Sequence, residues 1–151
     1  MGQNNPQQTV AKLRARIQAS FDRQSMMTTF GAQLATVATG RIEITAPILP
    51  GAMQQQGHGH AALSFALGDT AAGYAALTMI PEDHEVVTAE IKINLLAPAR
   101  GDLLVARGKV LKPGRRLVVV TSEVFAQTTG AAGLREKLIA VLQGTMVPVP
   151  I

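Results

Sequence analysis

Residues 60–80 read HAALSFALGDTAAGYAALTMI, and this stretch decides the fold. Asp69 is its only charged residue among Ala, Leu, Phe, Met and Gly. A run of about 20 apolar residues has the length of a membrane span. A charge near the centre of a span costs about 2.5–3.5 kcal/mol, however, and Ala and Gly offset little of that cost. We therefore predict a helix that protein encloses on nearly every side.

The patterns on either side of this helix predict strands. Residues 34–38 and 42–46 flank a turn at Thr39-Gly40, which indicates a first hairpin. Residues 48–57 carry turn residues and a short Gln run, and they predict a loop. Downstream, apolar residues alternate with polar ones, which predicts a strand with one buried face formed by Val87, Ala89, Ile91, Ile93 and Leu95.

The C-terminal part of the sequence predicts a second hairpin and a last strand. Residues 103–112 and 115–127 flank Pro113-Gly114, which suits the second and third positions of a type II turn. Residues 128–133, rich in Thr, Gly and Ala, predict a loop, and the last strand is expected at about 137–147.

Before all of these elements, apolar residues recur three to four apart over residues 8–21 and predict an amphipathic docking helix. The expected order is helix, two strands, buried helix and four strands. This order indicates an α+β fold in which an antiparallel sheet curls around the buried helix. A doubly wound fold is not expected, because helices do not alternate with strands and no Gly-x-Gly-x-x-Gly turn follows a strand.

Length and composition limit the class of protein. The 151 residues are 47% apolar, which predicts a single domain over residues 1–151 with its core at about 30–147. The absence of Cys excludes a disulfide framework, a thiolate zinc site and a Cys nucleophile. Residues 1–8, MGQNNPQQ, lack the basic and apolar regions of a secretory signal, so a cytoplasmic protein is expected.

The charge does not favour nucleic acid as a partner. The net charge is 14 − 10 = +4, only 16% of residues are charged, and four Phe and one Tyr are available for base stacking. A small phosphorylated ligand fits this balance better, and no membrane partner is expected.

Asp69 is the residue that most needs an explanation, because an ionised carboxylate inside an apolar helix needs a partner or a chemical role. Besides a functional role for Asp69, there are two structural alternatives. In the first, Gly68-Asp69-Thr70 is a turn and Asp69 caps a second helix; in the second, the carboxylate simply reaches water.

The start of the helix offers a second chemical group. His58 and His60 precede it in Gly-His-Gly-His, where a metal site would need two or three further ligands; we predict a polar loop and no metal. Free backbone N–H groups at a helix start, such as that of Ala61, can stabilise a developing oxyanion.

The spacing of Ala61 and Asp69 predicts an oligomer. Eight residues separate them, or about 12 Å along a helix axis at 1.5 Å per residue. One subunit cannot direct both groups at one atom. If Asp69 is the base and the Ala61 N–H the oxyanion donor, they come from different subunits, with two such helices antiparallel across a twofold axis.

A serine in the helix and a basic cluster in the second hairpin are further candidates for a functional role. Ser64 is not in a Gly-x-Ser-x-Gly elbow, so a hydrolase triad is not expected and Ser64 is assigned to the core. Lys112, Arg115 and Arg116 flank the Pro-Gly turn, where they either bind phosphates or are solvated hairpin charges.

The sequence also resembles a known family. The run QQQGHGHAALSFALGDTAAGYAA, followed by VVTAEIKINLLAPARGDLLVARGKVLKPGRRLVVVTSEVF, is similar to the PaaI-type hotdog thioesterases, which cleave acyl-coenzyme A thioesters. The resemblance covers about residues 30–147. It implies the hotdog fold, an antiparallel sheet of five to six strands curled around a central helix, in agreement with the element order above.

The resemblance implies roles for the two groups already singled out. Asp69 matches the catalytic carboxylate of the family, a general base or nucleophile. His60 falls on the His of a His-Gly-Gly motif, and Ala61 falls on the Gly whose N–H faces the thioester oxygen. Here Ala61-Ala62 replaces Gly-Gly, which keeps the backbone donor and adds bulk beside the acyl group.

It also implies contributions from more distant residues. Gln54 falls where the family usually has an Asn near the attacking water. Thr88 matches a hydroxyl residue that assists from the other subunit. Substrate-binding roles follow for a residue of the IKINLLAPA strand and for the basic cluster: Asn94, Lys112, Arg115 and Arg116.

These observations predict an acyl-coenzyme A thioesterase that releases a carboxylate and free coenzyme A. It needs no cofactor, because coenzyme A is part of the substrate, and it is expected to be a homodimer or homotetramer. Two alternatives remain: a non-catalytic acyl-coenzyme A binding or sensing protein, and a hotdog dehydratase or hydratase in which His60 works with a carboxylate. The acyl group, aromatic or aliphatic, is left open.

Overall fold

The computed structural model describes residues 6–151. Of the N-terminal stretch 1–8 that argued against a secretory signal, residues 1–5 lie outside the described part. The elements follow one another as α1 (Pro6–Phe21), α2 (Ser25–Thr29), β1 (Gln33–Ala38), β2 (Arg41–Pro47), a 3-10 turn (Pro50–Ala52), α3 (Ala61–Leu77), β3 (His84–Leu95), β4 (Leu103–Lys112), β5 (Val118–Gly130) and β6 (Gly133–Pro150).

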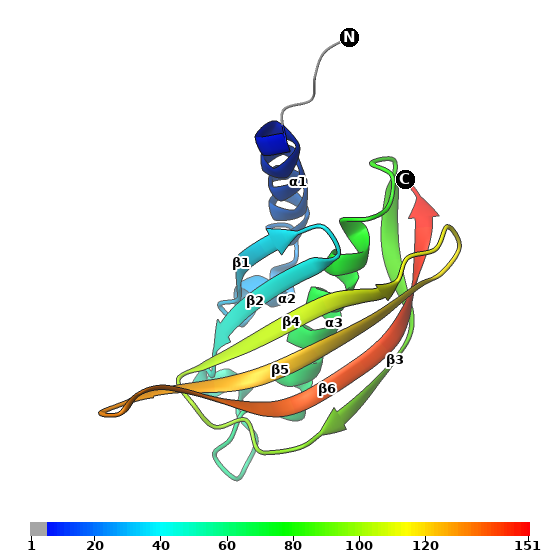
Figure 1. Cartoon of the computed structure of the whole chain (residues 1–151). Helices are drawn as coiled ribbons and strands as arrows, with labels where there is room; N and C mark the ends of the chain where they lie inside the picture. Colours follow the sequence, from blue (N-terminus) through cyan, green and yellow to red (C-terminus); the bar gives the residue numbers. More distant parts are fainter. Residues whose placement is uncertain (1–5) are drawn as a thin grey trace.

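The strands of residues 6–151 form one six-stranded antiparallel sheet in the order β1-β2-β4-β5-β6-β3, and α3 packs against one of its faces (Figure 1). This arrangement confirms the predicted α+β fold and the central buried helix. Over the described residues, no helix is both long enough and apolar enough to cross a bilayer.

The small residues of α3 let the sheet approach its backbone closely. A Cβ atom added to Gly108 of β4 would lie 2.2 Å from the carbonyl oxygen of Ala71, and one added to Gly68 would lie 2.6 Å from Cδ1 of Leu142 on β6. Such distances are far below van der Waals contact. A glycine on β4 in the first contact and a glycine on α3 in the second therefore allow the sheet to pack closely around α3.

The amphipathic N-terminal helix is confirmed, but only its C-terminal half is docked. Ile17 and Phe21 are buried, and Leu13 packs against the same core, whereas Val10 is 58% exposed. Figure 1 shows the start of α1 standing clear of the sheet. The sequence pattern did not indicate α2, a single short helix that buries only Met27.

Arg16 joins α1 to the end of the central helix. Its guanidinium group donates to four backbone carbonyl oxygens between the end of α3 and the start of β3: Leu77 at 3.4 Å, Ile80 at 3.3 Å, Pro81 at 3.0 Å and His84 at 2.9 Å. The bond to Leu77 satisfies a carbonyl group in the last turn of α3, and the other three hold the connection between α3 and β3 against α1.

The two C-terminal turns differ from the prediction. Residues 128–133 are not a loop, because β5 and β6 pair as far as Gly130 and Gly133, with Gly133 at a φ of 95°. Gly114 lacks the positive φ of a type II turn, and β5 begins at Val118, so residues 113–117 form a longer connection than predicted. Gly114 is instead in close contact, since an added Cβ would lie 2.3 Å from the Leu117 carbonyl oxygen.

Of the five residues predicted to form the buried face of β3, only Ile91 and Ile93 pack against the core. Register shifts between Thr88 and Glu90, so Ala89 is an extra residue, a β-bulge that reverses the alternation. Val87 is 50% exposed and Leu95, at the end of the strand, is 55% exposed, so the prediction is wrong for both. β3 is also an edge strand, because its only partner among the described strands is β6.

Candidate active site

The N-terminus of α3 presents a free backbone donor. His60 is the N-cap residue, and its Nδ1 accepts the N–H of Ala62 at 2.9 Å. Two backbone bonds hold the preceding loop in place, from His60 to the Ala52 carbonyl at 2.8 Å and from Gly59 to the Ala99 carbonyl at 3.0 Å. Within residues 6–151 the amide of Ala61 has no acceptor, and it lies at the positive end of the helix dipole.

This helix start opens into a first cavity of ≈490 Å³. It is lined by Gln54, His60 and Ala61, and it is closed by the segment 95–99 that follows β3. The structure therefore brings three of the predicted site residues together. The Gln54 side chain is engaged within its own loop, where Oε1 accepts the Gln56 N–H and Nε2 donates to the Gln56 side-chain oxygen at 3.3 Å.

Asp69 lies in the middle of α3, which excludes the predicted alternative of a turn with a second helix cap. Its carboxylate is partly buried, and Oδ1 accepts the hydroxyl of Thr88 at 2.9 Å. Burial raises the pKa of Asp69 above its ordinary value, and the Thr88 hydrogen bond partly opposes that rise. Oδ2 has no hydrogen-bond donor in the described part of the chain, so it is available to a water molecule or an electrophilic carbon.

Thr88 reaches Asp69 within the same chain, so it belongs to the Asp69 half of the predicted site. The bulge at Ala89 explains this position. Thr88 pairs with the buried Met146, so its side chain lies on the α3 side of the sheet, whereas Glu90 pairs with Thr145 on the outer side.

A second cavity, of ≈220 Å³, adjoins Asp69 and Thr88. Its other polar lining residues are Thr70 and Tyr74 of α3, Glu85 of β3, and two residues from α1 and the turn after it, Ser20 and Gln24. These five residues were not predicted to belong to the site. Tyr74 carried a usable signal, because a buried tyrosine places its hydroxyl beside a polar partner and Tyr74 follows Asp69 by little more than one helical turn. Nothing in the sequence connected Ser20 or Gln24 to Asp69.

The two halves of the predicted site stay apart within one chain. Ala61 and Asp69 belong to one uninterrupted helix, so the rise of 1.5 Å per residue separates them by about 12 Å. None of the residues that the structure describes lines both the first and the second cavity.

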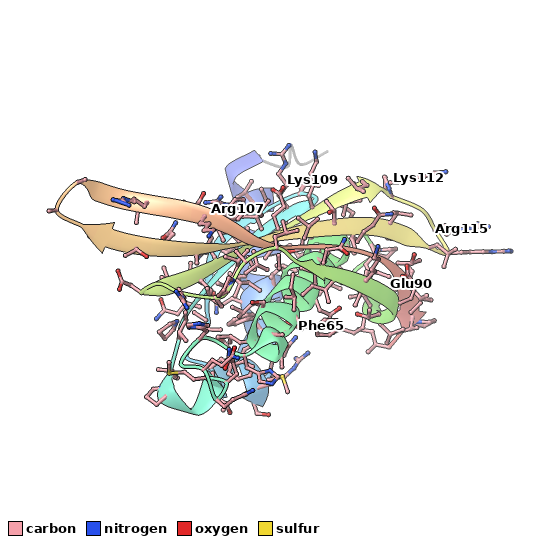
Figure 2. All side chains as sticks on the ribbon, turned by 90° about the horizontal axis from the view of Figure 1, so that it is seen from below. Phe65, Glu90, Arg107, Lys109, Lys112 and Arg115 are labelled. Atoms are coloured by element: carbon pink, nitrogen blue, oxygen red, sulfur yellow. The ribbon has the colours of Figure 1, made fainter. Side chains whose placement is uncertain are left out.

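The predicted substrate-binding residues lie away from both cavities. Asn94 is exposed and alternates with Ile93, which packs against the core, so Asn94 is on the outer face of the sheet. Lys112 and Arg115 lie at one end of the sheet, and both point away from the body of the protein (Figure 2). Arg115 also lines a cavity of ≈500 Å³ with Met79 and His84, beyond the C-terminus of α3.

The same architecture occurs in solved structures. A thioesterase family protein from Silicibacter pomeroyi is 35% identical, with 92% of this chain and 99% of that chain covered and a TM-score of 0.87. A conserved protein from Pseudomonas aeruginosa is 27% identical over 83% of this chain and 94% of its own, with a TM-score of 0.73. The PaaI protein of Escherichia coli, from a phenylacetic acid degradation operon, shares the fold at 20% identity. The match covers 93% of this chain and 96% of that chain, with a TM-score of 0.78.

A search among curated proteins gave no significant match. The thioesterase superfamily matches residues 56–132, which run from the loop before α3 to the β5–β6 turn and include Ala61, Asp69 and Thr88. This match confirms the hotdog thioesterase family that the sequence resembles. The chain belongs to the thioesterase superfamily and is a thioester hydrolase.

Proposed function

We propose that the protein hydrolyses acyl-coenzyme A thioesters at a site shared by two subunits, with Asp69 from one and the Ala61 N–H from the other. The observation that carries the proposal is the position of both groups in one continuous helix, each beside its own cavity. Thioester hydrolysis needs an activated nucleophile and a donor for the oxyanion, and each half of α3 offers one of the two.

The proposed chemistry uses the free oxygen of Asp69. Asp69 either removes a proton from water, which then attacks the thioester carbon, or attacks that carbon directly to form an anhydride that water opens. The negative charge that develops on the carbonyl oxygen is stabilised by the Ala61 N–H. The C–S bond breaks, coenzyme A leaves as a thiolate, and the thiolate takes up the proton. No cofactor is required by this sequence of steps.

The uncovered face of α3 supports the shared site. The α3 residues that the sheet leaves at least partly exposed lie on one helix face, and these are Ala61, Ala62, Phe65, Ala66, Asp69, Thr70 and Gly73. Figure 2 shows Phe65 projecting from α3 on the side away from the sheet. All of these residues except Phe65 are short, so a second α3 can approach closely enough to place its Ala61 near Asp69.

The edge of the sheet supports the same assembly. β3 is 12 residues long, and its outer edge has no strand partner among the described residues. Unpaired edges of this length are templates for pairing with another chain. We propose a dimer in which two β3 edges meet and two α3 helices lie antiparallel; a tetramer would be a pair of such dimers.

The nucleotide part of the substrate has separate candidates. We propose that Lys112, Arg115 and Arg116 bind the phosphates of coenzyme A, because they are exposed cations at one end of the sheet. Asn94 is proposed to contact the same part of the substrate, since it lies on the outer face and away from Asp69.

The test of the proposed function is hydrolysis of a panel of acyl-coenzyme A thioesters by the parent and by Asp69→Asn. The variant keeps the shape of the side chain and removes the base, so kcat/KM is expected to fall by at least about a hundredfold. Asp22→Asn makes the same change on the exposed turn after α1 and should leave the rate unaltered. Turnover of Asp69→Asn within a few fold of the parent, at equal thermal stability, rules out Asp69.

A further inference from the structure

The wall of the second cavity opposite Asp69 and Thr88 is made of hydrogen-bonding groups that the proposed hydrolysis does not use. Tyr74 is only 5% exposed, and its hydroxyl accepts Nε2 of Gln24 at 2.9 Å and donates to Oγ of Ser20 at 3.2 Å. A cavity that only had to exclude water would be lined by apolar groups. Beside Asp69 and Thr88, this one also has the hydroxyls of Tyr74 and Ser20 and the amide of Gln24 in its lining.

The three groups are not fully satisfied by one another. Among the described residues, the Ser20 hydroxyl hydrogen has no acceptor and the Gln24 side-chain oxygen has no donor. A donor and an acceptor therefore remain free on the same wall. A ligand hydroxyl can accept from Ser20 and donate to Gln24, whereas a methyl group in that place leaves both unpaired.

The dimensions suit the acyl part of a thioester. Asp69 and Tyr74 are five residues apart on α3, or about 7.5 Å along its axis. The volume of ≈220 Å³ lies below the range of about 300–1,000 Å³ that is typical of pockets for larger ligands. The pantetheine arm and the nucleotide are too large for this space, so the group beyond the thioester carbon is the one that fits.

The charges around the cavity favour a neutral group. The residues that line it include two carboxylates, Asp69 and Glu85, and the guanidinium group of Arg23 lies 3.7 Å from Glu85. An anionic acyl end would meet like charge from both carboxylates.

We propose that Gln24 and Ser20, held in place by Tyr74, determine specificity by binding a neutral hydrogen-bonding group at the far end of a short acyl chain. The inference rests on the proposed function, because it places the thioester carbon at Asp69. Gln24 and Ser20 are the specificity-determining residues, and Tyr74 is a positioning residue.

The experiment compares three coenzyme A thioesters of similar length: 6-hydroxyhexanoyl, heptanoyl and adipoyl. For the parent, kcat/KM with the hydroxylated substrate is expected to exceed that with heptanoyl by at least about tenfold, because a site built for a hydroxyl rejects its methyl analogue. Adipoyl is expected to be the poorest substrate. Gln24→Leu should reduce the hydroxyl preference below about twofold while heptanoyl hydrolysis is retained.

Two further variants separate specificity from folding. Gln18→Leu makes the same change on α1 outside the cavity and should keep the parental preference. Ser20→Ala removes the donor with little change in volume and should weaken the preference even if Gln24→Leu does not fold. An equal loss of kcat/KM for the 6-hydroxyhexanoyl and heptanoyl substrates in Gln24→Leu and Ser20→Ala overturns the inference, and so does the absence of a preference in the parent. The cavity wall then supports the fold or holds water.

Binding distinguishes failure of this inference from failure of the proposed function. If the parent hydrolyses none of the thioesters, the proposed function fails. The affinities of 6-hydroxyhexanoyl- and heptanoyl-coenzyme A are then measured by calorimetry for the parent and for Gln24→Leu. The inference predicts at least about tenfold tighter binding of the hydroxylated compound by the parent and less than about twofold by the variant.

Discussion

The hydroxyl of Thr88 on β3 lies 2.9 Å from the carboxylate of Asp69 on α3, and a single extra residue makes this contact possible. In a strand of regular alternation Thr88 would share a face with Glu90, which pairs on the outer side of the sheet. The bulge at Ala89 places Thr88 and Ile91 on the inner face instead. The irregularity of β3 therefore builds the site.

Thr88→Val should make the enzyme more sensitive to acid. The Thr88 hydroxyl stabilises the charged form of Asp69, so its removal raises the pKa of that carboxyl further. As the pH falls, the active, ionised form of Asp69 is then lost at a higher pH than in the parent, and the acid limb of the kcat/KM profile shifts to higher pH. One hydrogen bond of about 1 kcal/mol predicts about fivefold lower kcat/KM on that limb.

The control is Thr145→Val, which deletes a hydroxyl that bonds Glu90 on the outer face at 2.7 Å. It should leave the pH profile unchanged. A Thr88→Val profile that overlays that of the parent would show that this hydrogen bond does not tune Asp69.

Gly108→Ala should destabilise the fold. The new methyl group would meet the backbone of Ala71 and Ala72, which cannot move without displacing α3 from the sheet. Overpacking of this kind costs about 1–3 kcal/mol, measurable as a lower urea midpoint. At Gly130 an added Cβ meets nothing within 4 Å, so Gly130→Ala should stay within about 0.5 kcal/mol of the parent. Equal stability of the two variants would contradict the close packing of α3 on β4.

Arg115→Ala combined with Arg116→Ala should raise KM for acyl-coenzyme A and weaken its dependence on salt, because pairing of cations with phosphates is screened by ions. An increase of roughly tenfold is expected for two lost charge-assisted contacts. A short thioester without the nucleotide should be hydrolysed as by the parent. Equal losses with both substrates would assign these residues to the fold.

Local pattern was enough to predict the architecture. The small-residue helix at 60–80 was predicted because it is apolar on all sides, and β2 was predicted from the side-chain period of two. The limits of β4 were predicted from the turn at Pro113-Gly114 that follows it. The errors fall where local pattern is ambiguous. The run of Thr, Gly and Ala at 128–133 has the composition of a loop, yet the pairing of β5 with β6 extends through most of it.

Residue spacing predicted the candidate site only as far as it lies on α3, and the two residues outside this helix, Gln54 and Thr88, were predicted from the family resemblance. His60, Ala61 and Asp69 are fixed by their spacing along α3, whereas Thr88 depends on a bulge that strict alternation hides. Gln24 joins the second cavity through tertiary packing, and it is 50 positions from Tyr74 in the sequence. Sequence spacing carries no information on such a contact.

The shared site is tested most directly by mixing two inactive variants. Asp69→Ala removes the carboxylate, and Ala61→Pro removes the backbone N–H at a helix position that tolerates proline. A twofold dimer with one subunit of each kind has one site with both lesions and one site with neither. Sedimentation first establishes that mixed dimers have formed.

Re-annealed mixtures are then assayed for acyl-coenzyme A hydrolysis. The account predicts recovery of up to about half of the parental activity per mixed dimer, from two variants that are each inactive alone. No recovery in mixed dimers shown to have formed, or full activity in a monomer, would contradict a site built from Asp69 of one subunit and Ala61 of the other.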